Sequence, residues 1–268
     1  MLDSLAEWLA NLDRHVDIPI LYGAWSAGRF HYLSLLAVIA GAWFSYAIIR
    51  HAPAHRLFRY LGVLTILGLA GELLRQVFAL SQNDWAYPWS FFPYAFYMSG
   101  LLSGLGIMFF KDRALGKALQ SYLGSFAFCG ALMVLARPDA FYGHSLLLNV
   151  LTVLHHGLVL SMGIALIAHR RQVLYRWFLA ASGWMLFFTG IGYATGLMLA
   201  QHASLGLYRL FFITPPEVGM MTAWFVSMQR SLPFEQFTLL YYGIFVVVAF
   251  VTLNFAVYIM DRLAWEIA

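Results

Sequence analysis

Seven long apolar stretches, separated by short polar connections, are the feature that most constrains this chain. The hydrocarbon core of a bilayer is about 30 Å thick, so a spanning helix needs about 20 mainly apolar residues. Hydrophobic residues make up 62% and charged residues 10% of the chain, against roughly 45–50% and 25% in soluble domains. A soluble protein is excluded, and we predict an all-α, seven-helix polytopic membrane protein. The spans are expected at about 30–49, 60–80, 89–110, 119–135, 145–168, 177–199 and 237–260.

Loops rich in basic residues alternate along the chain with loops poor in them, and this alternation predicts the orientation of the bundle. Short cytoplasmic loops are enriched in Lys and Arg. One side carries a net charge of +7 and the other −3, so the N-terminus is expected outside and the C-terminus in the cytoplasm of a plasma-membrane protein. The basic residues of the predicted inner side are Arg50, Arg56, Arg59, Lys111, Arg113, Lys117, Arg170, Arg171, Arg176 and Arg262.

Two segments lie outside the seven spans. Residues 1–28 open with Leu2, Leu5, Trp8 and Leu9 at helical spacing among acids, which predicts an amphipathic helix on the outer surface rather than a cleavable signal peptide. The stretch at about 201–233 is apolar but contains two adjacent prolines. We interpret it as an apolar outer lid over the domain of residues 29–268; a hydrophobic connection packed on the helix ends is the alternative.

Several kinds of chemistry are excluded by the residues that the spans lack. The single cysteine, Cys129, rules out an internal disulfide and CxxC motifs, and neither lysine falls inside a predicted span, as a retinal protein would need. No phosphate-binding loop, nucleophile elbow or HExxH occurs. The basic excess is explained by topology, so no nucleic-acid partner is expected, and no metal or cofactor is predicted.

Ionisable residues at membrane depth are the candidate site, because an unpaired charge there is costly. Glu72, Arg75 and Gln76 share one helix face by their spacing, and Glu72 with Arg75 forms either a site or an ion pair that fixes packing. His155 and His156 fall near the midplane and point about 100° apart. Together with polar residues of the outer half, they predict a ligand-binding cavity that opens outward. The further candidates are His31, Tyr94, Tyr97 and Tyr193.

Short pieces of the chain resemble the YwaF-like integral membrane family, whose animal relatives are acyltransferases acting on ether phospholipids. The pieces are Phe-His-Tyr-Leu around His31, Arg-Pro-Asp at 137–139, His-His-Gly at 155–157, Ile-Gly-Tyr at 191–193 and Thr-Pro-Pro at 214–216. The resemblance maps the family's histidine onto His156. Tyr97 stands where the family has its acyl-carrying cysteine, and Ala95, Gly192 and Thr214 replace its His, Asn and Lys. Because tyrosine is a much poorer acyl acceptor than a thiolate, covalent acyl transfer does not carry over.

Three functions are compatible with this pattern. The favoured one is a membrane protein that binds or moves a membrane lipid or amphipathic small molecule, or that serves as the membrane partner of another protein. The alternative is a lipid or cell-envelope acyltransferase or hydrolase, with His156 as general base and Glu72 orienting it. The third is a structural subunit of a larger complex, whose polar pairs only specify packing.

Overall fold

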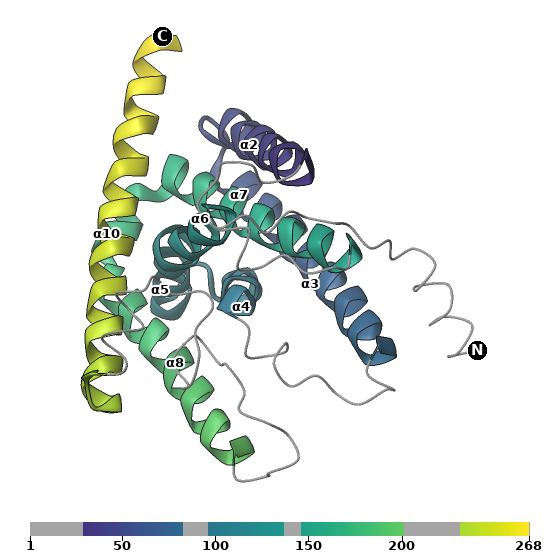
Figure 1. The fold of residues 1–268 in the computed structure, drawn as a ribbon. Coiled ribbons are helices and arrows are strands. Elements are labelled where there is room, and N and C mark those ends of the chain that lie inside the picture. The colour runs from purple at the N-terminus through teal and green to yellow at the C-terminus, as the bar shows by residue number, and fades with distance from the viewer. Residues whose placement is uncertain (1–28, 83–95, 137–145, 201–230, 268) are drawn as a thin grey trace.

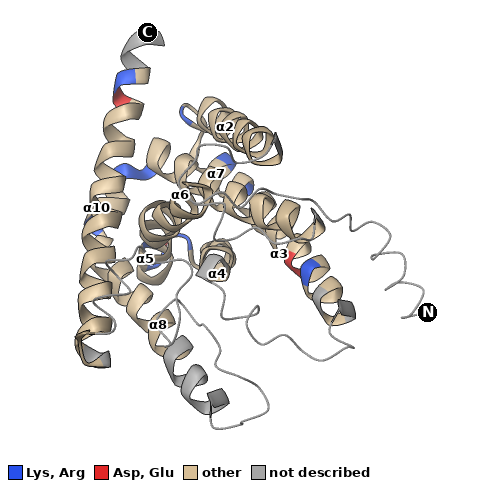
Figure 2. Cartoon of the chain, viewed as in Figure 1, with Lys and Arg blue, Asp and Glu red and all other residues tan. Residues whose placement is uncertain are grey.

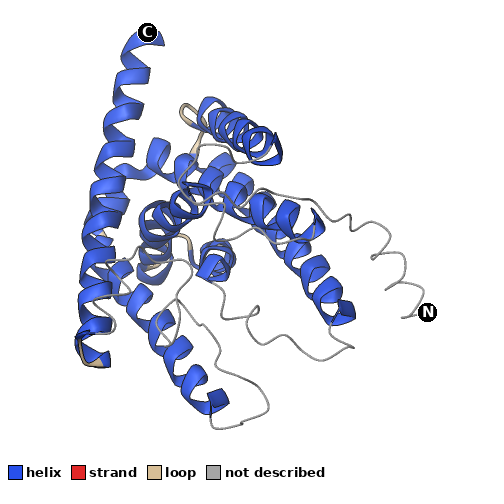
Figure 3. Ribbon diagram, in the orientation of Figure 1, coloured by secondary structure: helices blue, strands red, loops and turns tan. Residues whose placement is uncertain are grey.

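The computed structural model describes residues 29–82, 96–136, 146–200 and 231–267, and the regular structure in these ranges is entirely helical (Figure 3). The all-α prediction is therefore confirmed for the described residues. Figure 1 shows the long C-terminal helix α10 along one side of the molecule. The helices are α2 (Arg29–Ile49), α3 (Ala54–Gln82), α4 (Phe96–Phe110), α5 (Ala114–Tyr122), the π-helical turn η1 (Leu123–Ala127), α6 (Phe128–Ala136), α7 (Leu146–Arg176), α8 (Phe178–Ala200) and α10 (Phe234–Ile267).

Five described stretches are long and apolar enough to cross a membrane. They match the first, second, fourth, fifth and seventh predicted spans, and two shorter apolar helices, Met98–Phe110 and Phe178–Ile191, fall within the third and sixth. The predicted outer helix of residues 1–28 and nearly all of the predicted lid lie outside the described residues. The five stretches are Phe30–Ile49, Ala54–Phe78, Ala114–Ala136, Leu147–Arg176 and Gln236–Leu263.

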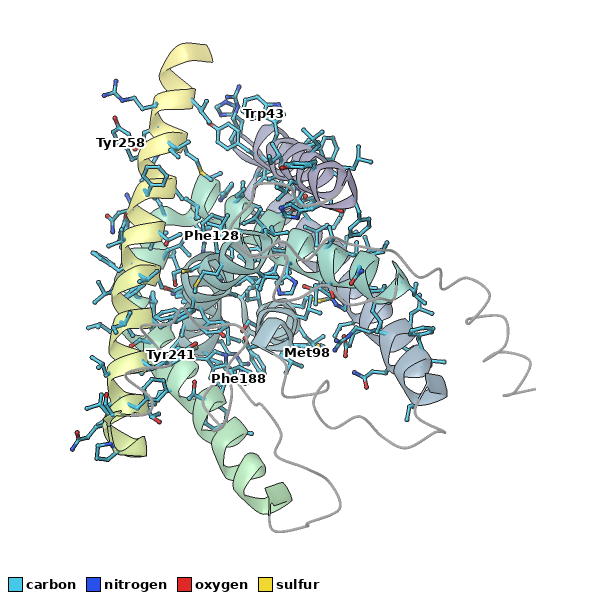
Figure 4. All side chains as sticks on the ribbon, viewed as in Figure 1. Trp43, Met98, Phe128, Phe188, Tyr241 and Tyr258 are labelled. Atoms are coloured by element: carbon cyan, nitrogen blue, oxygen red, sulfur yellow. The ribbon has the colours of Figure 1, made fainter. Side chains whose placement is uncertain are left out.

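The outer helices expose large apolar side chains, as expected of a protein embedded in lipid. Leu36 on α2 is 63% exposed and Phe255 on α10 is 62% exposed. Trp43 and Tyr258 lie on the outside of these helices in Figure 4. In water so many exposed apolar side chains would drive aggregation, whereas lipid tails solvate them. The surface therefore supports a membrane-embedded protein.

The core of the bundle is the segment α5–η1–α6. Buried residues make up 83% of its most apolar window, against 28% in α2 and 22% in α10. Phe126 of the π-helical turn stacks on Phe178 of α8, with 5.1 Å between ring centroids, and on Tyr122 at 5.8 Å. The fourth predicted span is thus the central helix, surrounded by the others.

Two irregularities depart from the straight helices that the sequence predicts. The fourth span contains the π-helical turn, and Gly124 within it packs against Leu174 of α7. The fifth continues beyond its predicted end at about residue 168 to Arg176, with non-helical φ −130° and ψ 22° at Arg170. Leu174 is fully buried, and its carbonyl oxygen accepts a hydrogen bond from Ser121 at 2.7 Å. Tertiary contacts therefore hold residues 171–176 against the core instead of releasing them as a loop.

Small residues let the helices approach closely. A Cβ added to Gly100 of α4 would lie 3.1 Å from Val159 of α7, and one added to Gly104 would meet Thr65 of α3. On α3, a Cβ on Gly68 would meet Leu101 of α4. Close packing at small residues is a principal source of helix association in lipid, where apolar burial gives little driving force.

The basic residues assigned to one side by sequence occupy helix ends that meet in the structure. The Nε2–H of His169 on α7 donates to the carbonyl oxygen of Ala52, between α2 and α3, at 2.7 Å. Arg171 of α7 pairs with Asp261 of α10 at 2.7 Å. Elsewhere the helices carry few charges, apart from a red patch beside a blue one on α3 (Figure 2). We refer to the end formed by residues 50–59, 111–117, 169–176 and 261–262 as the basic end.

Gly116 tests the close packing at the start of α5. A Cβ there would collide with the carbonyl oxygen of Phe110, a backbone atom that cannot swing away. We expect Gly116→Ala to lower the free energy of unfolding in detergent by about 1–3 kcal/mol, measured by denaturant titration. The matched control is Gly183→Ala on α8, where an added Cβ meets nothing within 4 Å. Equal stability of the two variants would contradict this packing.

Candidate functional site

A buried ion pair on α3 is the centre of the candidate site. Arg75 donates from Nε to Glu72 Oε2 at 2.8 Å and from Nη2 to Oε1 at 3.0 Å, and Gln76 donates its amide N–H to Oε1. Glu72 is 3% exposed and Arg75 7%. The i, i+3 and i+4 spacing places all three side chains over one another on the helix. The predicted pairing of Glu72 with Arg75 is therefore formed.

His155 of α7 joins this pair from the neighbouring helix. Its Nε2–H donates to the carbonyl oxygen of Gly68 at 3.0 Å, and the same nitrogen lies 3.8 Å from Glu72 Oε2. The second distance is too long for a hydrogen bond, so this nitrogen is hydrogen-bonded to the Gly68 carbonyl and lies close to the carboxylate without bonding to it. The ring packs against α3 at Gly71, where an added Cβ would lie in ordinary van der Waals contact, 3.4 Å from Nε2.

His156 is also buried but occupies a different face of α7. It is 5% exposed, and its Nδ1–H donates to the carbonyl oxygen of Thr152 one turn earlier, at 2.7 Å. Asn149, seven residues before His156 and so on nearly the same face, is 1% exposed. The enzyme hypothesis drawn from the sequence uses His156 together with Glu72. In the structure, the histidine whose Nε2 lies 3.8 Å from Glu72 Oε2 is His155.

His31 is buried at the start of α2, the helix that packs on another face of α7. A Cβ on Gly157 would lie 3.0 Å from Val38, and one on Gly41 would lie 3.8 Å from Ser161. These two contacts show that α2 and α7 run in the same direction where Val38 and Gly41 pack against α7.

The site lies far from the basic end along each helix. Glu72 is 18 residues, or about 27 Å, beyond the start of α3, and His155 is 14 residues, or about 21 Å, from His169. With a hydrocarbon core of about 30 Å, both positions fall in the half of the bundle opposite the basic end. The three predicted tyrosines cannot be placed beside them: Tyr94 and the side chains of Tyr97 and Tyr193 lie outside the described residues.

Sequence reasoning missed three contributors. Gly68 supplies the carbonyl acceptor for His155, Gly71 is the position on α3 against which its ring packs, and Asn149 is a buried amide beside the face of His156. The Gly-Leu-Ala-Gly run before Glu72 was the available signal, because paired small residues mark close helix approach. Asn149 is not among the predicted residues because its side chain is uncharged, whereas the prediction started from ionisable residues.

Comparison with known proteins yields no relative. No protein-family model matches the chain, and no curated protein or solved structure matches it either.

The arrangement offers polar recognition rather than metal chemistry. Within the described ranges, no three His, Cys, Asp or Glu side chains come together as a metal site. Glu72 and Arg75 instead present a carboxylate and a guanidinium side by side, with two imidazoles on α7. Such a group has both donors and acceptors for the polar part of an amphipathic molecule.

Replacing only one member of the Glu72–Arg75 pair should lower the free energy of unfolding, because the other charge is left buried without its counter-ion. We expect Arg75→Met to reduce the free energy of unfolding by about 3–5 kcal/mol, and Glu72→Leu/Arg75→Met to recover most of that loss. The measurement is denaturant titration in detergent. Arg171→Met is the matched control: its pair with Asp261 is about half exposed on both sides and should contribute less than about 1 kcal/mol. Similar losses for Arg75→Met and Arg171→Met would contradict burial of the site.

Proposed function

We propose that this chain is an integral membrane protein that binds or moves a lipid or another amphipathic molecule, holding its polar part at Glu72, Arg75 and His155. The observation that carries the proposal is the charged cluster buried between α3 and α7 in an otherwise apolar bundle. Ionisable residues at this depth are expensive and usually mark a ligand or ion path.

The burial of His155 supports this interpretation over a purely structural ion pair. Glu72 and Arg75 satisfy each other on α3 and would specify packing without a histidine. A leucine in place of His155 would leave the Gly68 carbonyl with its helical hydrogen bond and would avoid burying an imidazole. The buried, polar His155 is therefore better explained by a role in recognition.

The proposed membrane arrangement has seven spans in the plasma membrane, with the basic end in the cytoplasm and the C-terminus on that side. The charge difference between the two sides supports this orientation. It places the cluster in the outer half of the bilayer, where a ligand enters from the outer leaflet or the outer surface.

A second candidate is favoured by the approach of Glu72 to His155. A carboxylate that lies 3.8 Å from an imidazole can stabilise its protonated form, which is the arrangement of a general base oriented by an acid. An enzyme of lipid or cell-envelope metabolism, an acyltransferase or hydrolase, would use His155 or His156 in this role. Turnover of ester-linked lipid by the purified protein distinguishes it from a binding protein.

His155→Gln tests the binding proposal while retaining a donor for the Gly68 carbonyl. We expect normal folded yield but about tenfold less co-purified amphipathic ligand, equivalent to about 1.4 kcal/mol, measured by native mass spectrometry. The control is His169→Gln, another α7 histidine that donates to a carbonyl oxygen, that of Ala52, at the basic end. Equal ligand occupancy in the wild type and both variants would contradict the proposal; loss of yield only in His155→Gln would assign this histidine to packing.

The orientation is tested by labelling single introduced cysteines. Cys129 is 2% exposed and should not react with a membrane-impermeant maleimide. Asp112→Cys at the basic end and Gln236→Cys at the start of α10 both replace exposed residues. In intact cells we expect labelling of the second variant alone, and in inside-out vesicles labelling of the first. The reverse pattern would invert the proposed topology.

A further inference from the structure

Two cations at the basic end converge on one aromatic ring. Lys111 Nζ, between α4 and α5, lies 5.4 Å from the centroid of the Phe58 ring, and Arg170 Cζ on α7 lies 5.6 Å from it. Cation–π attraction explains each contact alone. It does not explain why two like charges are held at the same ring, where they repel each other.

Backbone contacts fix the segments that carry both cations. The carbonyl oxygen of Lys111 accepts a hydrogen bond from Gln120 Nε2 at 2.7 Å. Arg170 sits at the non-helical position of α7, between His169, which is bonded to Ala52, and the buried Leu174. The fold therefore fixes the backbone at both cations, although the Lys111 side chain is exposed and that of Arg170 is half-buried.

Neither cation has an acidic partner in the part of the chain that the structure describes. Asp261, the acid near this end of α10 whose side chain the structure describes, is paired with Arg171. Arg170 Nε is buried and makes no hydrogen bond to any described residue. Buried donors are nearly always satisfied, and unsatisfied charged ones are especially costly. The site thus has a net positive charge and an unused N–H group.

We propose that the phosphate of an anionic phospholipid binds between Lys111 and Arg170, beside Phe58. A phosphate oxygen accepts hydrogen bonds from a guanidinium and an ammonium together, and basic pockets between spanning helices suit lipid headgroups. An acyl chain has an apolar surface to follow: Met108 of α4 is 39% exposed and lies against Gly62 of α3. This site is separate from the Glu72 cluster and does not depend on the function proposed for it.

The test compares binding of short-chain phosphatidylglycerol, short-chain phosphatidylcholine and inorganic phosphate to the detergent-purified protein by native mass spectrometry. The site variant is Lys111→Gln/Arg170→Gln. The control variant, Arg176→Gln/Arg262→Gln, removes the same charge from exposed positions of the same end. Circular dichroism and size-exclusion chromatography check that both remain folded. We expect phosphatidylglycerol to bind the wild type best, and the site variant to bind it at least about tenfold more weakly than the control variant does.

Each other outcome overturns the proposal. Equal losses in the two variants would mean that the basic end attracts anions only diffusely. Binding of inorganic phosphate as tight as that of phosphatidylglycerol would assign the site to a free anion rather than a lipid. Should the site variant fail to fold, Phe58→Leu replaces it; this change keeps both cations but removes the ring that positions them, and unchanged binding would then count against the site.

Discussion

Close approach of helices at glycine is the constraint on which the rest of this structure depends. In lipid, burial of apolar side chains contributes little to helix association, so helices are held by tight packing and by polar contacts between them. Gly68 shows both effects. A Cβ there would meet Leu101 of α4, and its buried carbonyl accepts the hydrogen bond of His155 from α7. The same position therefore brings α4 against α3 and fixes the ring that approaches Glu72, so packing and site cannot vary independently.

The packing of α7 on α3 also bears on which residues form the charged cluster. Glu72 and Arg75 lie one turn apart and pair on a single helix, so neither charge is buried without its counter-ion. His155 adds no formal charge while it is neutral, and it enters only when α7 packs. A cluster assembled in this order does not bury an unpaired charge at any stage. It still leaves imidazole and carboxylate 3.8 Å apart in the assembled bundle, a spacing that a ligand or a proton can use.

Features that depend on the length and period of a single helix can be predicted from the sequence, whereas features that depend on contacts between helices cannot. The Glu72–Arg75–Gln76 face follows from the 3.6-residue period, and the described hydrogen bonds agree. Of the seven apolar stretches, five correspond to described helices that are long and apolar enough to cross a membrane. Which histidine approaches Glu72 depends on the rotation of α7, which Val38 of α2 and Gly68 of α3 set together. The π-helical turn likewise packs against Leu174, more than 45 residues away in the chain. No local pattern contains that information.

The two arginine sites differ in how their charge is balanced. Arg75 is 7% exposed, and the chain supplies Glu72 as its counter-ion. Arg170 lies at the end of α7, level with the helix ends, and no acid in the described ranges pairs with it. An arginine at the depth of lipid headgroups can obtain its anion from the membrane, so a protein acid is unnecessary there. Arg75 thus takes its partner from the protein, whereas the partner that we propose for Arg170 comes from the lipid.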